Sequence, residues 1–208
     1  MGRLRAVVRR RGARLLSRTE VRLPWSHAVL APIQRRLFDG VAPVWDTIRD
    51  QSRVERLLDD ALDFLDRPDP THALDIGTGT GQAAFALARK FPTATIDAID
   101  GSATMIEQAR RKPNPGRVVF RTADAAALPF AARTFELVIS LCVQPFAAET
   151  ARVLTPDGLA LYAYSSGPGT PIWFPPETLE RVLRPHGLEA AGRGESAGGV
   201  WSAFRKRA

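Results

Sequence analysis

Cysteine and histidine are scarce in this sequence. Its 208 residues include one cysteine, Cys142, and three histidines that are far apart in the chain. A single cysteine excludes an internal disulfide framework and a zinc site built from cysteines. Scattered histidines do not indicate a metal cluster, so we predict no metal. A reducing cytoplasm is the simplest setting for such a chain.

Long apolar runs are also missing. A helix needs about 20 consecutive apolar residues to cross a bilayer, and every apolar run here is much shorter. We therefore predict no transmembrane segment. Hydrophobic residues make up 45% of the chain, which is normal for a globular protein. A length of 208 residues suits one domain with a single core.

The net charge of +7 comes from the first forty residues. They hold ten arginines against two acidic residues, whereas the rest of the chain holds nineteen basic and twenty acidic residues. We therefore divide the chain into a basic arm, residues 1–36, and a domain, residues 37–208. We predict that the arm is partly disordered or helical, or that its start is assigned too early. Clustered arginine attracts anionic surfaces, so peripheral membrane contact stays open, whereas the neutral domain argues against nucleic acid.

Beyond the arm, helical and strand patterns alternate. Apolar spacing predicts helices over 44–65, 81–91, 103–111, 147–154 and 177–183. Short apolar segments predict strands over 72–76, 93–100, 117–124, 134–141 and 159–165, then two more near Leu188 and over 200–204. This alternation predicts an α/β fold, a Rossmann-like, doubly wound and mainly parallel sheet in a three-layer αβα sandwich. The last two strands predict a C-terminal antiparallel hairpin.

Three glycines follow the first predicted strand, in "ALDIGTGTGQ" (residues 73–82). A phosphate-binding P-loop would need a lysine after its last glycine, but Gln82 stands there. A dinucleotide fingerprint matches Gly77 and Gly79 but would place its third glycine at Gln82. A carboxylate at Asp75 would repel a pyrophosphate and attract a cofactor that carries an amine or a sulfonium. The pattern therefore favours a cationic nucleoside cofactor.

Two more carboxylates end the next two predicted strands. Asp100 comes 23 residues after Gly77, where a carboxylate can accept both hydroxyls of a ribose. Asp124 ends the third strand and can accept the exocyclic amine of adenine. Taken alone, Asp100 could assist a helix cap at Ser102, and Asp124 could form a turn. Together with Asp75, the two acids outline a nucleoside that carries an amino acid.

Five segments resemble, in order and spacing, the signatures of class I S-adenosylmethionine-dependent methyltransferases. They are "LDIGTGTGQ", "AIDGSATMIEQAR", "ADAAALPF", "FELVIS" and "ARVLTPDGLALY". The most similar group comprises the small-molecule methyltransferases related to ubiquinone/menaquinone biosynthesis. "FDGVAPVWD" (residues 38–46) resembles that group's N-terminal segment, which folds over the cofactor. The resemblance covers about residues 37–205.

The resemblance implies S-adenosylmethionine as the cofactor and assigns its parts to positions of this sequence. The residues expected to bind it are Asp75, Gly77, Thr78, Gly79 and Gly81 at the methionine part, Asp100, Gly101 and Ser102 at the ribose, Asp124 and Ala125 at the adenine, and Ser140 and Leu141 at the amine and the transferred methyl.

Methyl transfer from a sulfonium depends mainly on orientation, so we assign no catalytic residue. If the acceptor must lose a proton, the candidate bases near the strand ends are Cys142, Gln144, Tyr164 and His27. The segment after the fourth strand is about two helical turns shorter than in the resembled group and lacks histidine. Aromatic residues in 37–46 and in "GPGTPIWFPP" (residues 167–176) then suggest substitute walls and an apolar or planar acceptor. Packing of these loops on the core is the competing interpretation.

We therefore expect a cytoplasmic S-adenosylmethionine-dependent methyltransferase that acts on a small organic molecule. Three alternatives stay open. The first is a module of the same fold that binds the cofactor, or nothing, without transferring methyl. The second is a nicotinamide-dependent reductase, and the third is a nucleic-acid methyltransferase anchored by the arm.

Overall fold

A computed structural model of the chain describes residues 12, 15, 17–19, 21, 23, 26–65, 68–114 and 117–208. Most of the basic arm, including all of residues 1–11, lies outside this part, so the disorder or helix expected there stays a prediction. Within the described residues, no helix has both the length and the apolar content that a membrane span requires. The same residues bring together no group of three metal-binding side chains.

Strands and helices alternate along the chain, as the sequence predicted. The strands are β1 (His72–Ile76), β2 (Thr95–Asp100), β3 (Val118–Thr122), β4 (Phe135–Leu141), β5 (Leu154–Tyr164), β6 (Leu188–Ser196) and β7 (Gly199–Lys206). The helices are α2 (His27–Val41), α3 (Trp45–Ile48), α4 (Gln51–Asp63), α5 (Gln82–Lys90), α6 (Ala103–Arg110), α7 (Ala147–Val153) and α8 (Pro176–Leu183). Short 3-10 turns are η2 (Ala42–Val44), η3 (Gly167–Gly169) and η4 (Arg184–His186).

The strands form one sheet in the order β3-β2-β1-β4-β5-β7-β6. The first five pair in parallel, and β7 runs antiparallel between β5 and β6. The predicted C-terminal hairpin is therefore confirmed, and its turn places Ala197 and Gly198 at positive φ, as tight hairpin turns require. The chain order reverses between β1 and β4, and ligands bind beyond the carboxyl ends of strands at such a switch point.

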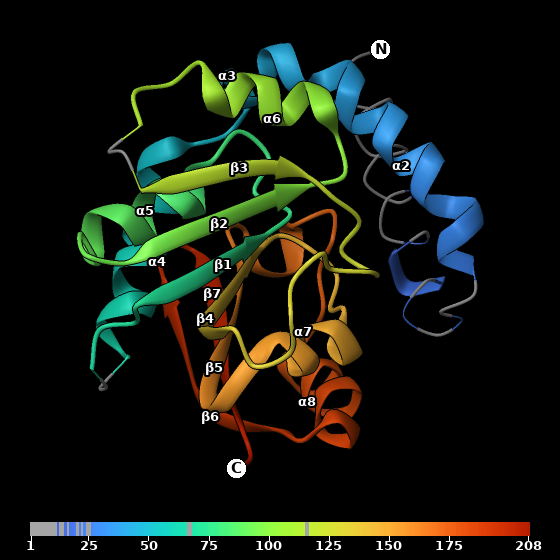
Figure 1. Cartoon of the computed structure of the whole chain (residues 1–208). Helices are drawn as coiled ribbons and strands as arrows, with labels where there is room; N and C mark the ends of the chain where they lie inside the picture. The colour runs from blue at the N-terminus through green and yellow to red at the C-terminus, as the bar shows by residue number, and fades with distance from the viewer. Residues whose placement is uncertain are drawn as a thin grey trace.

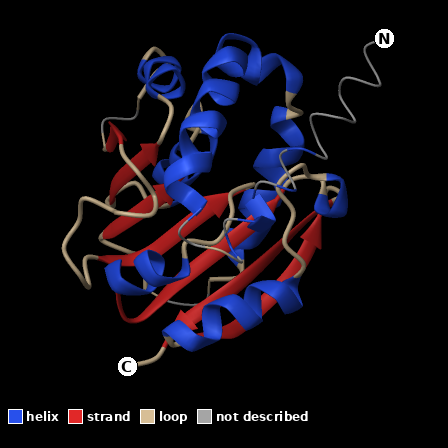
Figure 2. Ribbon diagram, turned by 90° about the vertical axis from the view of Figure 1, so that its right-hand side faces the viewer, coloured by secondary structure: helices blue, strands red, loops and turns tan. Residues whose placement is uncertain are grey.

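Two apolar layers cover the sheet, one on each face (Figures 1 and 2). Successive side chains of a strand point to opposite faces, and β1 shows this directly. Ala73 belongs to the cluster that includes α4, α5 and α6, whereas Leu74 belongs to the cluster that includes α7 and α8. The predicted α/β fold class, a three-layer αβα sandwich, is confirmed.

The predicted helix over 44–65 is wrong in one respect, because two helices occupy this segment. α3 ends at Ile48, and α4 begins after Asp50, whose carboxylate accepts a hydrogen bond from the Arg53 amide at 3.0 Å. Asp50 has an extended backbone (φ −75°, ψ 96°), which is the usual conformation of an N-cap residue. The break turns the side chain of Arg49 toward the carboxyl edge of the sheet, where it contacts residues after β4 and β5.

We call residues 27–50 the strap. This segment contains α2, η2 and α3, and Figure 1 shows α2 beside α6 and near the ends of β2 and β3. α2 crosses the boundary predicted at residues 36 and 37, since it runs from His27 to Val41. The strap thereby brings side chains from both the arm and the domain to the carboxyl edge of the sheet.

Candidate cofactor site

The glycine loop, residues 77–81, joins β1 to α5 at the switch point. All three of its glycines have positive φ: +71° at Gly77, +54° at Gly79 and +94° at Gly81. Glycine adopts this conformation without the strain that a Cβ would add. A Cβ on Gly77 would also lie 2.4 Å from the Val143 side chain. The glycines therefore let the backbone turn tightly against the segment after β4.

Asp75 lies at the end of β1 and is fully buried (0% exposed). Neither of its carboxylate oxygens has a hydrogen-bond partner of good geometry, and the hydroxyl of the buried Thr78 is also unpaired. Burial raises the pKa of Asp75 to about 7, and the neighbouring Thr78 hydroxyl and Ala84 amide offset this rise only in part. An unpaired buried carboxylate is costly, so a cationic group close to the loop would stabilise its ionised form.

Asp100 ends β2 and fastens the glycine loop. Its two oxygens accept hydrogen bonds from the backbone amides of Gly79 and Ser102, both at 2.8 Å. Burial raises the pKa of Asp100, the two amides oppose the rise, and the Asp39 carboxylate adds to it. Ser102 caps α6 through the Met105 amide at 3.1 Å, as predicted, and its hydroxyl donates to Asp39 of the strap. Asp100 therefore stays anchored while each oxygen keeps acceptor capacity for a ligand hydroxyl.

Asp124 follows β3 and is held by the strap. One of its oxygens accepts from His27 Nε2 at 2.8 Å and from the Ala126 amide at 2.9 Å, and the other accepts from Arg35 at 3.1 Å. Burial raises the pKa of Asp124, but these hydrogen bonds and the electrostatic effect of His27 and Arg35 outweigh it and hold the pKa below its usual value. The Arg35 side chain also packs against Gly101, where a Cβ would lie 3.3 Å from Nε. Asp124 is therefore ionised near neutral pH.

Ser140 and Leu141 lie at the buried tip of β4, and Ala125 packs on the cluster that includes α7 and α8. The strand registers align these tips, since Ile76 pairs with Ile99 in β2 and with Ser140 in β4. The structure thus brings the glycine loop and the strand-end residues to one edge of the sheet.

The four candidate bases lie in different environments. Tyr164 is buried, which raises its pKa well above 10, and its hydroxyl donates to the Val143 carbonyl at 3.4 Å. His27 lies beside Asp124, at the end of the site expected to hold adenine. Gln144 is buried, and Cys142 contacts Ser165 at 3.4 Å. The structure does not bring these four side chains together as one catalytic group.

The aromatic residues expected to wall the site divide into two groups. Phe174 is 2% exposed and belongs to the core, and Trp173 packs edge-on against the buried Tyr164 at 5.1 Å between ring centroids. Trp45 lies at the site instead, with Nε1 3.5 Å from the position of a Cβ on Gly79. Phe38 packs edge-on against Trp45 at 5.8 Å. Packing therefore accounts for the first pair, and the strap supplies the aromatic surface at the glycine loop.

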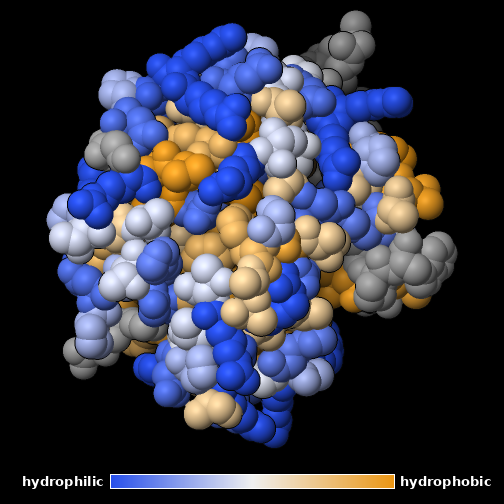
Figure 3. Space-filling model, in the orientation of Figure 1, coloured by the Kyte–Doolittle hydropathy of each residue, from blue (hydrophilic) through white to orange (hydrophobic). Residues whose placement is uncertain are grey.

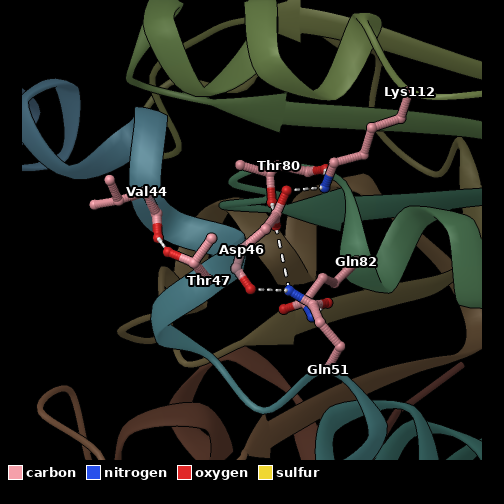
Figure 4. Close-up of polar contacts among 7 residues, drawn as sticks. All are labelled: Val44, Asp46, Thr47, Gln51, Thr80, Gln82 and Lys112. Carbon is pink, nitrogen blue, oxygen red and sulfur yellow. Dashed lines mark hydrogen bonds and ion pairs between the residues drawn. The ribbon is translucent and has the colours of Figure 1, made fainter.

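A cluster of polar side chains ties α3 to the glycine loop (Figure 4). The Asp46 carboxylate accepts from the Thr80 hydroxyl at 2.6 Å and pairs with Lys112 at 2.7 Å. Lys112 also donates to the Thr80 carbonyl at 2.8 Å, and Gln51 donates to the Asp46 carbonyl at 3.1 Å. Burial raises the pKa of Asp46, but the bonds from Lys112 and Thr80 outweigh it, so the pKa lies below its usual value. This cluster fixes the part of the strap that carries Trp45.

Sequence reasoning missed the strap residues that contact the strand ends. They are Arg35, Asp39, Asp46 and Arg49. The segment "FDGVAPVWD" gave a signal for two of them, because its resemblance places it over the cofactor. Arg35 and Arg49 gave none, since nothing local distinguishes them from other arginines of the chain.

Comparison with known proteins agrees with this geometry. Residues 73–158 match the family model described as a methyltransferase domain. The chain is 35% identical over 115 residues to a malonyl-[acyl-carrier protein] O-methyltransferase of Xylella fastidiosa, covering 53% of this chain and 38% of that protein. It is 34% identical over 136 residues to the ubiquinone/menaquinone biosynthesis C-methyltransferase UbiE of Paracoccus denitrificans, covering 59% of this chain and 54% of that protein.

A solved structure shows the same fold. It is described as a SAM-dependent methyltransferase from Aquifex aeolicus, with a TM-score of 0.66 and 18% identity over 77% of this chain and 95% of that chain. The chain spans only 38%, 45% and 50% of the lengths of three malonyl-[acyl-carrier protein] O-methyltransferases that it matches. The matched segment nevertheless contains the glycine loop, Asp100 and Asp124. Residues 73–158 therefore match a methyltransferase domain, and the chain as a whole has the Rossmann-like fold of the solved structure.

Proposed function

We propose that this chain transfers a methyl group from S-adenosylmethionine to a small organic acceptor. The observation that carries the proposal is the set of three strand-end carboxylates around the glycine loop at the switch point. Asp75 is unpaired and suits a cationic group, while Asp100 and Asp124 are anchored acceptors at the ends of β2 and β3. A nucleoside that carries an ammonium and a sulfonium matches all three.

The residues fit the cofactor in the following way. Asp100 would hold the ribose hydroxyls, with Gly101 and Ser102 beside it, and Asp124 would accept the adenine amine beside Ala125. The glycine loop would face the methionine part, and Ser140 and Leu141 would border the methyl. When bound, the cofactor supplies an activated methyl group. The protein's own contribution is to orient the two reactants and to exclude water.

Calorimetry with S-adenosylmethionine tests the proposal directly. We expect the wild type to bind, and we expect Asp100→Ala to bind about tenfold to a hundredfold more weakly, because hydrogen bonds to a charged acceptor are lost. Glu55→Asn, on the exposed part of α4, is a matched control for loss of a surface carboxylate. A wild type that does not bind contradicts the proposed cofactor, and equal binding by Asp100→Ala contradicts the ribose assignment.

We also propose that the acceptor is apolar or planar. Trp45, which lies beside the glycine loop, supports this class because its ring offers a flat apolar surface at the site. A methylation assay over a panel of small acids, phenols and quinones, with and without Trp45→Ala, tests it. A polar aliphatic acceptor that is methylated equally well by both proteins would contradict this proposal. A cytoplasmic location stays a prediction.

Peripheral contact between the basic arm, residues 1–36, and a membrane surface is the last part of this proposal. Val29, Ile33 and Leu37 recur every fourth residue on α2 and are 64%, 47% and 52% exposed. Figure 3 shows apolar surface on the flank where α2 lies. The arginines of residues 1–36 would add attraction to anionic lipid. In a sedimentation assay, phosphatidylglycerol vesicles should therefore capture more of the wild type than phosphatidylcholine vesicles do. Phosphatidylglycerol vesicles should also capture less of an Ile33→Asp variant than of the wild type. Equal capture in all cases would contradict the contact.

A further inference from the structure

Arg49 extends from the break between α3 and α4 to the tips of two strands. Its Nη2 lies 3.3 Å from Cys142 Sγ, just after β4, and 3.4 Å from Ser165 Oγ, just after β5. The guanidinium also lies over the Trp45 ring, 5.1 Å from its centroid. These contacts fix the position of the guanidinium, because stacking on an aromatic face restricts its motion.

Among the residues that the structure describes, no carboxylate pairs with Arg49. Arginine is always protonated in proteins, and it is most stable beside a carboxylate or a phosphate. None of the ion pairs among the described residues includes Arg49. Its two polar partners are a thiol and a hydroxyl at the long limit of hydrogen bonding. Arg152 shows the contrast, since Glu149 accepts from it at 2.7 Å.

The guanidinium lies at the end of the site where methyl transfer is expected. Trp45, on which it stacks, approaches Gly79. Val143, the residue after the contacted Cys142, packs on Gly77. Arg49 is therefore next to the glycine loop, on the side of β4. The Asp124 contacts follow β3, which lies three positions away from β4 in the strand order of the sheet.

We propose that Arg49 binds a carboxylate at this end of the site. The inference rests on the proposed function, and it deepens it by naming a charge that the site recognises. Two carboxylates could arrive there: that of the cofactor's amino-acid part, and that of an acidic acceptor. The unpaired Asp75 supplies the opposite charge at the glycine loop, so the two residues together match the ammonium and carboxylate of an α-amino acid. The planar fork of arginine suits a carboxylate through two parallel hydrogen bonds.

Calorimetry with two nucleosides separates the possible sources. S-adenosylhomocysteine carries the amino-acid carboxylate, whereas 5′-methylthioadenosine keeps the adenosine and the sulfur but lacks the amino acid. Both are titrated into the wild type, Arg49→Gln and Arg49→Lys. Arg56→Gln, on the exposed face of α4, controls for loss of one positive charge. Malonate and benzoate are then titrated into each protein saturated with S-adenosylhomocysteine.

If Arg49 binds the cofactor, Arg49→Gln should bind S-adenosylhomocysteine about tenfold to a hundredfold more weakly than the wild type does, and it should bind 5′-methylthioadenosine with unchanged affinity. The affinity of Arg49→Lys for S-adenosylhomocysteine should lie between those of the wild type and Arg49→Gln, because lysine keeps the charge and loses the planar fork. Arg49→Lys also replaces Arg49→Gln in this comparison if the glutamine variant does not fold. If Arg49 binds the acceptor, malonate or benzoate should bind the wild type and not Arg49→Gln, with both nucleosides unchanged. Equal weakening of the two nucleosides, or no change in any titration, overturns the proposal. A wild type that binds neither nucleoside overturns the proposed function, and this inference with it.

Discussion

Replacing Asp75 by asparagine should change how the stability of the protein depends on pH. The Asp75 carboxyl is fully buried and unpaired, and its pKa is raised from 3.8 to about 7 by burial. An acid with a higher pKa in the folded state binds its proton more tightly there than in the unfolded chain. Its contribution to stability is therefore complete below about pH 4 and is lost as the pH rises through 7.

The size of the effect follows from the two pKa values. A shift of about three units corresponds to about 4 kcal/mol at most, at 1.36 kcal/mol per unit. Linkage then gives a contribution of about 2.7 kcal/mol at pH 5 and about 0.1 kcal/mol at pH 8. Asparagine has nearly the same shape but no proton to lose in this range. The stability of the wild type relative to Asp75→Asn should thus fall by about 2.5 kcal/mol between pH 5 and pH 8.

Urea unfolding of both proteins at pH 5, 6, 7 and 8 measures this difference, and equal m values show that the two unfold alike. Asp59→Asn, on the exposed part of α4, should follow the wild type at every pH. Saturation with S-adenosylmethionine should flatten the wild-type curve, because a cation near the loop holds the carboxylate ionised. Parallel curves for the wild type and Asp75→Asn without ligand would refute the reasoning, since Asp75 would then be ionised throughout and matched by a partner.

Three further changes test other parts of the site. Asp124→Asn should bind S-adenosylhomocysteine and 5′-methylthioadenosine about tenfold more weakly in calorimetry, because both ligands carry adenine. A loss of affinity confined to S-adenosylhomocysteine would contradict the adenine assignment. Asp46→Asn should lower the free energy of unfolding by about 0.5–1.5 kcal/mol, since Lys112 loses its half-exposed carboxylate partner, and unchanged urea midpoints would count against the cluster in Figure 4. Tyr164→Phe should keep methyl transfer within about threefold, because a phenol with so high a pKa is not a base near neutral pH; loss of turnover with normal cofactor binding would reverse this view.

Local patterns were sufficient to predict the alternation of strands and helices, the mainly parallel sheet and the C-terminal hairpin. β1 has the bounds that "HALDI" indicated. Ser102 caps α6, as a serine just before an apolar helical pattern predicts, because its side-chain oxygen accepts from a free amide of the first turn. The helix break at Arg49 was missed for a physical reason. Apolar residues keep helical spacing through the break, and it is the extended backbone of Arg49 and Asp50 that reveals it. Periodicity reports which face is buried, and it does not report whether the helix is continuous.

Contacts between distant residues could not be predicted at all. His27 and Asp124 are 97 positions apart, and Arg35 and Asp124 are 89 apart. No spacing rule connects such pairs, and composition indicated only that the arm is basic. Phe174 shows the same limit, because its place in a Pro/Gly-rich loop left an acceptor wall and core packing both open, and the structure buries it in the core at 2% exposure. Burial depends on how the loop folds back, which its own sequence does not specify.

The strap contacts the strand ends in an order that matches the sheet. From its N-terminal end, His27 and Arg35 bind Asp124 after β3, Asp39 binds Ser102 after β2, Asp46 binds Thr80 after β1, and Arg49 contacts Cys142 after β4. The spatial order of these strands is β3-β2-β1-β4. These contacts, two after β3 and one after each of the other three strands, mean that the strap crosses the carboxyl edge of the sheet, along which the proposed cofactor would lie extended from adenine to methyl. Residues proposed to bind the cofactor and residues that position the strap are therefore coupled, because Asp124 and Ser102 belong to both sets. This coupling gives the basic arm, which shares residues 27–36 with the strap, a physical connection to the site.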